Sequence, residues 1–258
     1  MKRRLLAVLM SVAGLLGPAA AALAQTCSKH SPAHTVALLE LYTSEGCSSC
    51  PPADRYLSGL RDPAALAGLG PDQLVPLALH VDYWNDIGWK DRFSSPQFTA
   101  RQRWLSQLAA SRTVYTPEVF VDGRELRNWH GDTVSAIKRI NARPAGAVID
   151  IALGAVAAGG VPLTVKAQSE QSGQLFVALY ENALSTDVRA GENSGAQLHH
   201  DYVVRELLGP FALKGGTAEL TRALKLPLAS ITKNLGVAAF VQSDQGQLLQ
   251  TLALPVCM

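Results

Sequence analysis

The first half of the chain alternates between short apolar runs and amphipathic stretches. Continuous apolar runs of strand length end at turn-forming residues, and apolar positions then recur at the spacing of a helix. An α/β order of elements follows. The pattern predicts strands over 36–42, 74–81 and 118–121, a return strand over 124–127, and helices over 53–60, from Pro96 onward and over 132–141.

The pattern changes after residue 146, where strand-like segments follow one another with turns between them. We expect an α/β thioredoxin-like domain over 25–146, with a central mixed sheet and flanking helices, and an all-β, sandwich-like domain over 147–258. The second domain is predicted to contain seven strands, over 147–153, 161–168, 174–181, 198–206, 218–226, 237–243 and 248–254.

The N-terminus has the features of an export signal. Three basic residues precede an uncharged apolar run over 5–17, and Ala22-Leu23-Ala24 offers a signal-peptidase site. The alternative, a membrane anchor, needs about 20 apolar residues, and Pro18 interrupts a run that is already short. We therefore predict that residues 1–24 are a signal peptide cleaved after Ala24, and that the protein is periplasmic or secreted.

Composition and charge narrow the class of protein. Hydrophobic residues make up 48% and charged residues 17%, which excludes a disordered chain. The formal charge is +2, and loss of the three basic residues near the N-terminus changes it to −1. A near-neutral chain has no basic footprint for nucleic acid, and no later segment is apolar enough to insert into a membrane.

If the protein is exported, its four cysteines can form two disulfides, because disulfides persist in oxidising compartments. Cys27 and Cys257 lie at the two ends of the exported chain, and the termini of domains are often close in space. We predict a structural disulfide between them. The alternatives are two free thiols or a bond to another chain.

Cys47-Ser48-Ser49-Cys50 is a C-x-x-C motif at a predicted strand-to-helix turn. A helix N-terminus stabilises a thiolate, so Cys47 is the candidate nucleophile and Cys50 the resolving thiol. An inert structural disulfide and a zinc site are the alternatives. Zinc would need further ligands from the histidines, and no second C-x-x-C or suitably spaced histidine pair is present, so we expect no metal and no cofactor. The candidate histidines are His80, His130, His199 and His200.

Thr116-Pro117 opens the predicted strand that leads into the hairpin at 122–123. This arrangement resembles the thioredoxin and glutaredoxin superfamily. The resemblance implies a cis-proline that packs against the C-x-x-C, with the residue before it offering its backbone to an extended substrate.

Three segments, at 40–54, 80–84 and 115–123, are similar to secreted bacterial proteins with a thioredoxin-like fold that form domain of unknown function family twelve-twenty-three. The resemblance covers most of the exported chain. It implies a fold and redox chemistry but no substrate.

The chain departs from ordinary thioredoxins at the position of their buried acid, where it has Leu41. Asp82, at the end of a predicted strand, is then the candidate for proton transfer. Tyr83 and Trp84 form either a pocket wall beside the thiols or part of the core. Arg101 is expected on a solvated helix face, and His199-His200 is expected to be structural because neighbouring strand residues point to opposite faces.

The sequence as a whole predicts an exported thiol–disulfide oxidoreductase that acts on protein or small-molecule disulfides. The alternatives are a non-enzymatic binding module with an inert disulfide and a periplasmic protein that holds copper or zinc.

Overall fold

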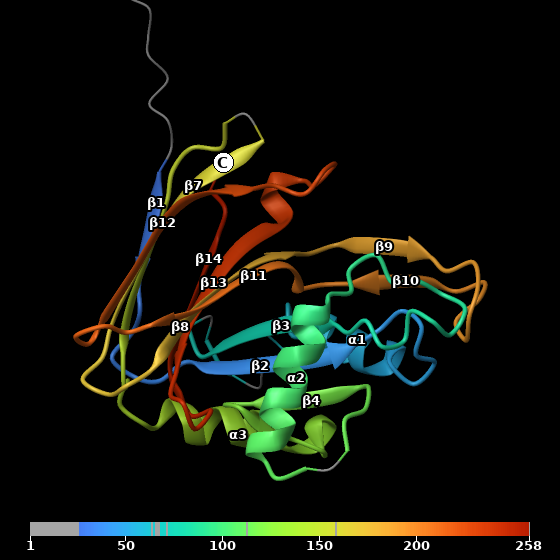
Figure 1. Cartoon of the computed structure of the whole chain (residues 1–258), viewed down its shortest axis with the longest axis horizontal. Coiled ribbons are helices and arrows are strands. Elements are labelled where there is room, and N and C mark those ends of the chain that lie inside the picture. The colour runs from blue at the N-terminus through green and yellow to red at the C-terminus, as the bar shows by residue number, and fades with distance from the viewer. Residues whose placement is uncertain are drawn as a thin grey trace, which may run out of the picture.

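The computed structural model describes residues 26–62, 64, 68–70, 72–111, 113–157 and 159–257 (Figure 1). The predicted signal peptide lies outside the described residues. The α-helices of the described part are α1 (Pro51–Gly59), α2 (Pro96–Leu108) and α3 (Trp129–Asn141), and η2 (Thr232–Asn234) is a short 3-10 helix. The strands are β1 (Cys27–His30), β2 (Ala37–Thr43), β3 (Leu74–His80), β4 (Glu118–Val121), β5 (Arg124–Glu125), β6 (Val148–Leu153), β7 (Gly160–Gln168), β8 (Gln174–Glu181), β9 (Leu184–Asp187), β10 (Gln197–His200), β11 (Val203–Ala212), β12 (Thr217–Lys225), β13 (Leu235–Gln242) and β14 (Leu248–Pro255).

The largest sheet has eight strands in the order β14-β13-β8-β11-β3-β2-β4-β5, so it takes strands from both sides of residue 146. β3 runs parallel to β2 and to β11, and the other pairs are antiparallel. The predicted helix-flanked thioredoxin-like fold followed by a β-sandwich is therefore wrong. The fold is instead β-rich. β11 pairs with the free edge of β3 and so extends the large sheet into the second half of the chain. The division of the chain near residue 146 stays a prediction.

The large sheet has an apolar layer on each of its faces. Both faces of β2, β3, β8 and β13 are therefore buried, and these strands are apolar almost without alternation. One face carries Tyr42, Phe176 and Phe240 in a core that reaches α2. The opposite face is divided between α1 with α3 and a four-stranded antiparallel sheet, β1-β6-β7-β12. β6 and β7 do alternate, because only one of their faces is covered.

The start of α2 agrees with its sequence signals. The Ser95 side chain accepts the N–H of Gln97, as expected of an N-cap residue before proline. Arg101, however, is not on a solvated face. It is buried and paired with Glu40, with Nε 2.6 Å from Oε1. A buried arginine with a carboxylate partner cannot be distinguished from a surface arginine by helical spacing alone.

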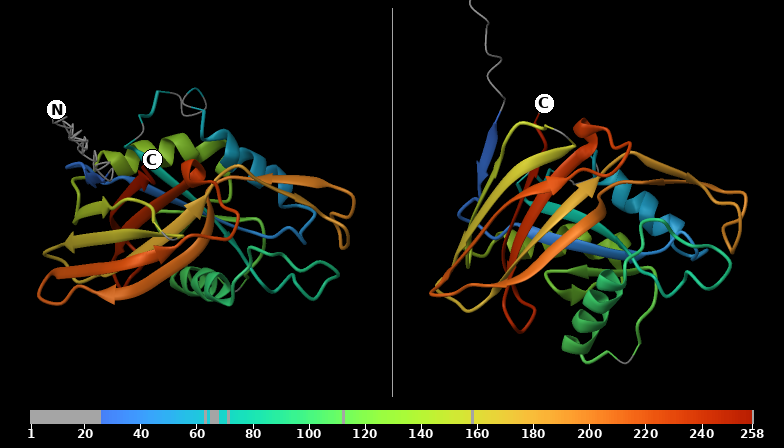
Figure 2. Two further views of the ribbon diagram at one scale, coloured as in Figure 1. Left: turned by 90° about the horizontal axis from the view of Figure 1, so that it is seen from above. Right: turned by 45° about the horizontal axis from the view of Figure 1, so that its top comes forward.

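The predicted strand over 198–206 is two strands. β10 ends at His200, Tyr202 has a positive φ of 57°, and β11 begins at Val203. β10 pairs with β9 in a separate two-stranded sheet, which we call the β9–β10 arm (residues 184–200). The arm projects past the large sheet on the side where α1 begins (Figures 1 and 2).

The two ends of the described chain are joined by a disulfide between Cys27 and Cys257. Cys27 opens β1 and Cys257 follows β14, so the bond links the four-stranded sheet to the edge strand of the large one. No helix among the described residues meets the length and hydropathy needed to cross a bilayer.

Candidate functional site

The C-x-x-C motif lies in the turn between β2 and α1. Cys47 and Cys50 form a disulfide, and Cys50 is the N-cap residue of α1. Both cysteines are fully buried, whereas Ser48 and Ser49 between them are exposed. Prolines occupy the next two positions and have no N–H group, so fewer unpaired donors face the cysteines than at an ordinary helix N-terminus.

The structure brings Thr116 and Pro117 to the cysteine pair, although 69 residues separate Thr116 from Cys47. The Thr116 carbonyl oxygen lies 3.8 Å from Cys47 Sγ and accepts the Ser49 hydroxyl at 3.4 Å. The Thr116–Pro117 peptide bond is cis. β4 then pairs with β2, which ends just before the motif, and this pairing holds the two segments together.

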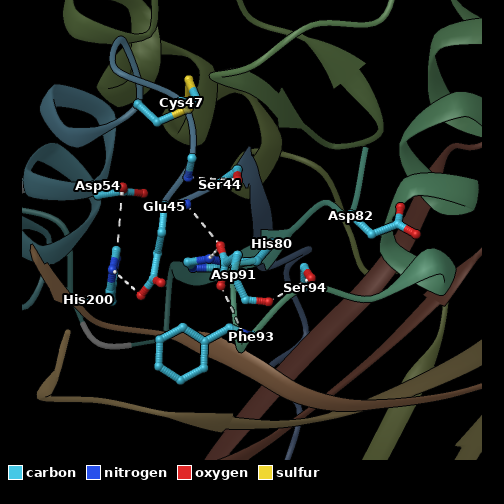
Figure 3. A network of polar contacts seen from close by, with 12 residues as sticks. Ser44, Glu45, Cys47, Asp54, His80, Asp82, Asp91, Phe93, Ser94 and His200 are labelled. Atoms are coloured by element: carbon cyan, nitrogen blue, oxygen red, sulfur yellow. Dashed lines mark hydrogen bonds and ion pairs between the residues drawn. A yellow bond between two sulfur atoms is a disulfide. The ribbon is translucent and has the colours of Figure 1, made fainter. Parts of the chain in front are cut away.

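The other three predicted pocket residues do not all lie beside the motif. Asp82 accepts the Thr99 hydroxyl of α2 and lies apart from Cys47 (Figure 3). Trp84 packs beside the motif, since a Cβ built on Gly46 would lie 3.4 Å from Trp84 Cβ. Tyr83 is half-buried, and burial raises its pKa to about 12. Trp84 is thus the one of the three that borders the residue preceding Cys47.

A buried network of five ionisable side chains lies beside the disulfide (Figure 3). None of them is more than 5% exposed. Asp91 is at its centre, with Oδ2 2.6 Å from His80 Nδ1 and accepting the backbone N–H of Glu45 at 2.8 Å. His200 Nε2 lies 3.4 Å from Glu45 Oε1, and His200 Nδ1 lies 3.8 Å from Asp54 Oδ2. The network therefore joins both flanks of the C-x-x-C, since Glu45 precedes Cys47 and Asp54 follows Cys50.

The protonation of the network follows from burial and pairing. Burial alone would lower the pKa of His80 and raise that of Asp91, but their mutual attraction outweighs it, so the His80 pKa is raised and the Asp91 pKa lowered. Burial would also raise the pKa of Glu45, but the neighbouring His200 imidazole and the hydrogen bond from the Trp89 indole N–H lower it. Asp54 differs, because burial dominates and raises its pKa.

Sequence reasoning missed Asp54 and assigned His200 a purely structural role. Asp54 was detectable, because it stands four residues after Cys50 and so lies on the same side of α1. His200 was not, because the arm that places it beside Asp54 was not predicted. The expectation that His199 and His200 point to opposite faces agrees with the structure, where His199 is exposed and His200 is buried.

Glu118 follows Pro117 directly and is also buried. Its Oε2 accepts the Gln102 side-chain amide at 2.6 Å. Burial raises the pKa of Glu118 to about 7. Within the described ranges, no group of three or more His, Cys, Asp and Glu side chains has a geometry suited to a metal ion.

The tip of the β9–β10 arm lies over the motif. Glu192 Oε2 accepts the Ser48 backbone N–H at 2.9 Å. Asn193 Nδ2 donates to the backbone oxygens of Glu45 at 2.9 Å and of Cys47 at 3.0 Å. The cysteine pair is thus surrounded by α1, the start of β4, the buried network and the arm.

Two solved structures resemble this chain. One is the X-ray crystal structure of a protein from Agrobacterium tumefaciens, with 23% identity and a TM-score of 0.59, which covers 87% of this chain and 96% of that one. The other is HBP35 of Porphyromonas gingivalis, with 17% identity and a TM-score of 0.63, which covers 88% of this chain and 76% of that one. At these identities the likeness extends to the fold alone.

No curated protein matches the chain significantly in sequence. A family model described as a protein of unknown function, DUF1223, matches residues 38–242. This match spans the C-x-x-C motif, the Thr116-Pro117 segment and the β9–β10 arm. The chain belongs to the DUF1223 family of proteins of unknown function.

Proposed function

We propose that this protein is an exported thiol–disulfide oxidoreductase that acts through Cys47 and Cys50. The observation that carries the proposal is the position of the pair, in the turn that begins α1 with the Thr116 carbonyl 3.8 Å from Cys47 Sγ. The Thr116 carbonyl lies beside one sulfur, and the disulfide closes a ring of only a few residues. We therefore expect the disulfide to open and re-form with little change elsewhere in the fold.

The exchange proceeds in two displacements. A substrate thiolate attacks Cys47 Sγ, which forms a mixed disulfide and releases Cys50 as a thiolate that takes up a proton. A second substrate thiolate then attacks the substrate sulfur of the mixed disulfide and releases Cys47. Two substrate thiols become one disulfide, and the cysteine pair is reduced. The reverse sequence reduces a substrate disulfide.

The surrounding charges favour the disulfide over the thiolates. Glu45 has a lowered pKa and is therefore an anion, and the two prolines remove N–H donors that would stabilise a thiolate. An oxidant of the DsbA type depends on a strongly stabilised reduced form. We therefore expect a reduction potential nearer to about −270 mV, as in thioredoxin, than to about −120 mV.

The test is reduction of insulin disulfides by wild-type protein and by Cys47→Ser, with dithiothreitol as the electron source. We expect Cys47→Ser to lose the stimulation and Cys27→Ser/Cys257→Ser, once shown to be folded, to keep it. Equal rates for wild type and Cys47→Ser would overturn the proposal. A Cys47–Cys50 potential below about −300 mV, typical of structural bonds, would favour the binding module with an inert disulfide.

A further inference from the structure

The tip of the β9–β10 arm covers the cysteine pair through contacts to the backbone of the motif itself. Glu192 and Asn193 together bind one N–H and two carbonyl groups between Glu45 and Ser48. Cys47 is completely buried, and the arm tip lies against its backbone. The arm tip therefore forms one wall of the surroundings of Cys47, and the start of β4, whose Thr116 carbonyl lies 3.8 Å from Cys47 Sγ, forms another.

The arm is held at both ends. At its base His200 lies in the buried network beside Glu45 and Asp54. Near its tip Gly191 has a φ of 73° and packs so closely that an added Cβ would lie 3.0 Å from Trp89 Cβ. The tip is thus seated by packing as well as by hydrogen bonds, and it covers the motif in a defined position.

Glu192 places a negative charge at the edge of the motif. Hydrogen bonds from Ser48 lower the pKa of Glu192, whose carboxylate remains exposed to solvent at the edge of the motif. An incoming anion meets this carboxylate before it reaches the sulfur, and an incoming cation is attracted by it.

We propose that Glu192 and Asn193 determine which thiols reach Cys47, with Asn193 closing the approach and Glu192 selecting neutral and cationic thiols over anionic ones. The inference rests on the proposed function, because it concerns access to the same disulfide. The step it controls is the first displacement. The bond from Cys47 to Cys50 breaks, a bond from the substrate sulfur to Cys47 forms, and the Cys50 thiolate takes its proton from water.

The experiment measures the rate at which the Cys47–Cys50 disulfide of the full chain is reduced by three small thiols. They are cysteamine, 2-mercaptoethanol and mercaptoacetate, which are similar in size. Their substituents are cationic, neutral and anionic, so the attacking thiolates become successively more negative. Rates are expressed per thiolate. The variants are Glu192→Gln, Asn193→Ala and, as a matched control, Glu219→Gln. Glu219 is exposed on β12, an edge strand of the four-stranded sheet, whereas the motif follows β2 of the eight-stranded sheet.

We expect Glu192→Gln to lower the ratio of the cysteamine rate to the mercaptoacetate rate between about fivefold and about thirtyfold. The ratio loses one attraction and one repulsion, and each is worth about fivefold in water near 4 Å. Asn193→Ala should raise all three rates together, and Glu219→Gln should change none. A ratio unaltered by Glu192→Gln, or rates unaltered by Asn193→Ala, would overturn the role of the arm while leaving exchange intact. A disulfide that no thiol reduces in any variant would overturn the proposed function as well. If Glu192→Gln shifts the ratio but the wild-type protein does not reduce insulin, the role of the arm is supported and only the proposed catalysis is overturned.

Discussion

Asp91 Oδ2 lies 2.6 Å from His80 Nδ1, and neither side chain is exposed to solvent. The same carboxylate oxygen accepts the backbone N–H of Glu45, two residues before Cys47. The pair thus fixes the peptide that leads into the C-x-x-C motif. It also links β3, which carries His80, to the loop that carries Asp91.

Replacing Asp91 with Asn should destabilise the protein by about 3–5 kcal/mol near neutral pH, because it leaves a buried imidazole without its charged partner. Urea denaturation measures the free energy of unfolding. Asp86→Asn, an exposed residue of the same loop, is the control. Equal stability of Asp91→Asn and the wild type would contradict the assignment.

The difference in stability between the wild type and Asp91→Asn should depend on pH in a defined direction. The Asp91 pKa is below its ordinary 3.8, so its contribution is present above that pH and is lost as pH falls through the folded value. The His80 pKa is above its ordinary 6.5, so its contribution is complete below 6.5 and is lost as pH rises through the folded value. The free energies of unfolding of the wild type and of Asp91→Asn should therefore differ most at about pH 5–6.

Asp54→Asn should make the cysteine pair of the reduced protein more acidic. An ionised Asp54, four residues after Cys50, opposes formation of a thiolate, and the neutral amide does not. We expect the pKa of the more acidic thiol to fall by about half a unit to one unit. Ultraviolet absorbance of the thiolate against pH measures it, with Asp132→Asn in the first turn of α3 as the control. Superimposable titration curves would exclude this influence.

Glu118→Gln should make stability less dependent on pH. Burial raises the pKa of Glu118 from 4.5 to about 7, so ionisation costs the folded state more as pH rises through this range. Allowing for solvent screening, the variant should gain roughly 1–2 kcal/mol relative to the wild type between about pH 5 and pH 8. Denaturation at several pH values tests this. A parallel pH dependence in both proteins would refute it, and Glu219→Gln should follow the wild type.

The two disulfides should contribute unequally to stability. Cys27–Cys257 closes a loop of 230 residues, whereas Cys47–Cys50 closes a loop of three. In the chain-entropy model the first contributes at most about 5 kcal/mol and the second about 2 kcal/mol. Calorimetry of Cys27→Ser/Cys257→Ser and of Cys47→Ser/Cys50→Ser compares them. The reverse order of melting temperatures would contradict the model.

The local pattern of apolar and polar residues was sufficient to predict most of the individual strands and helices. The apolar runs predicted the ends of β2, β3, β8 and β13 to within two residues. The reason is that strands buried on both faces have continuous apolar sequences. Ser95 before Pro96 marked the start of α2 for an equally local reason. The short strands β1 and β9 were missed, since four residues of mixed polarity carry little signal.

The sequence by itself determined the motif, the apolar strands and the cysteines available for pairing, since these depend on residue type and near neighbours. Only the tertiary structure decided that β11 joins β3, so that strands from both sides of residue 146 share one sheet. It also decided that Arg101 is buried, that His200 meets Asp54 and that Glu192 covers Ser48. Each of these joins residues far apart in the chain, and such pairings depend on which edges and faces the complete fold leaves to be covered.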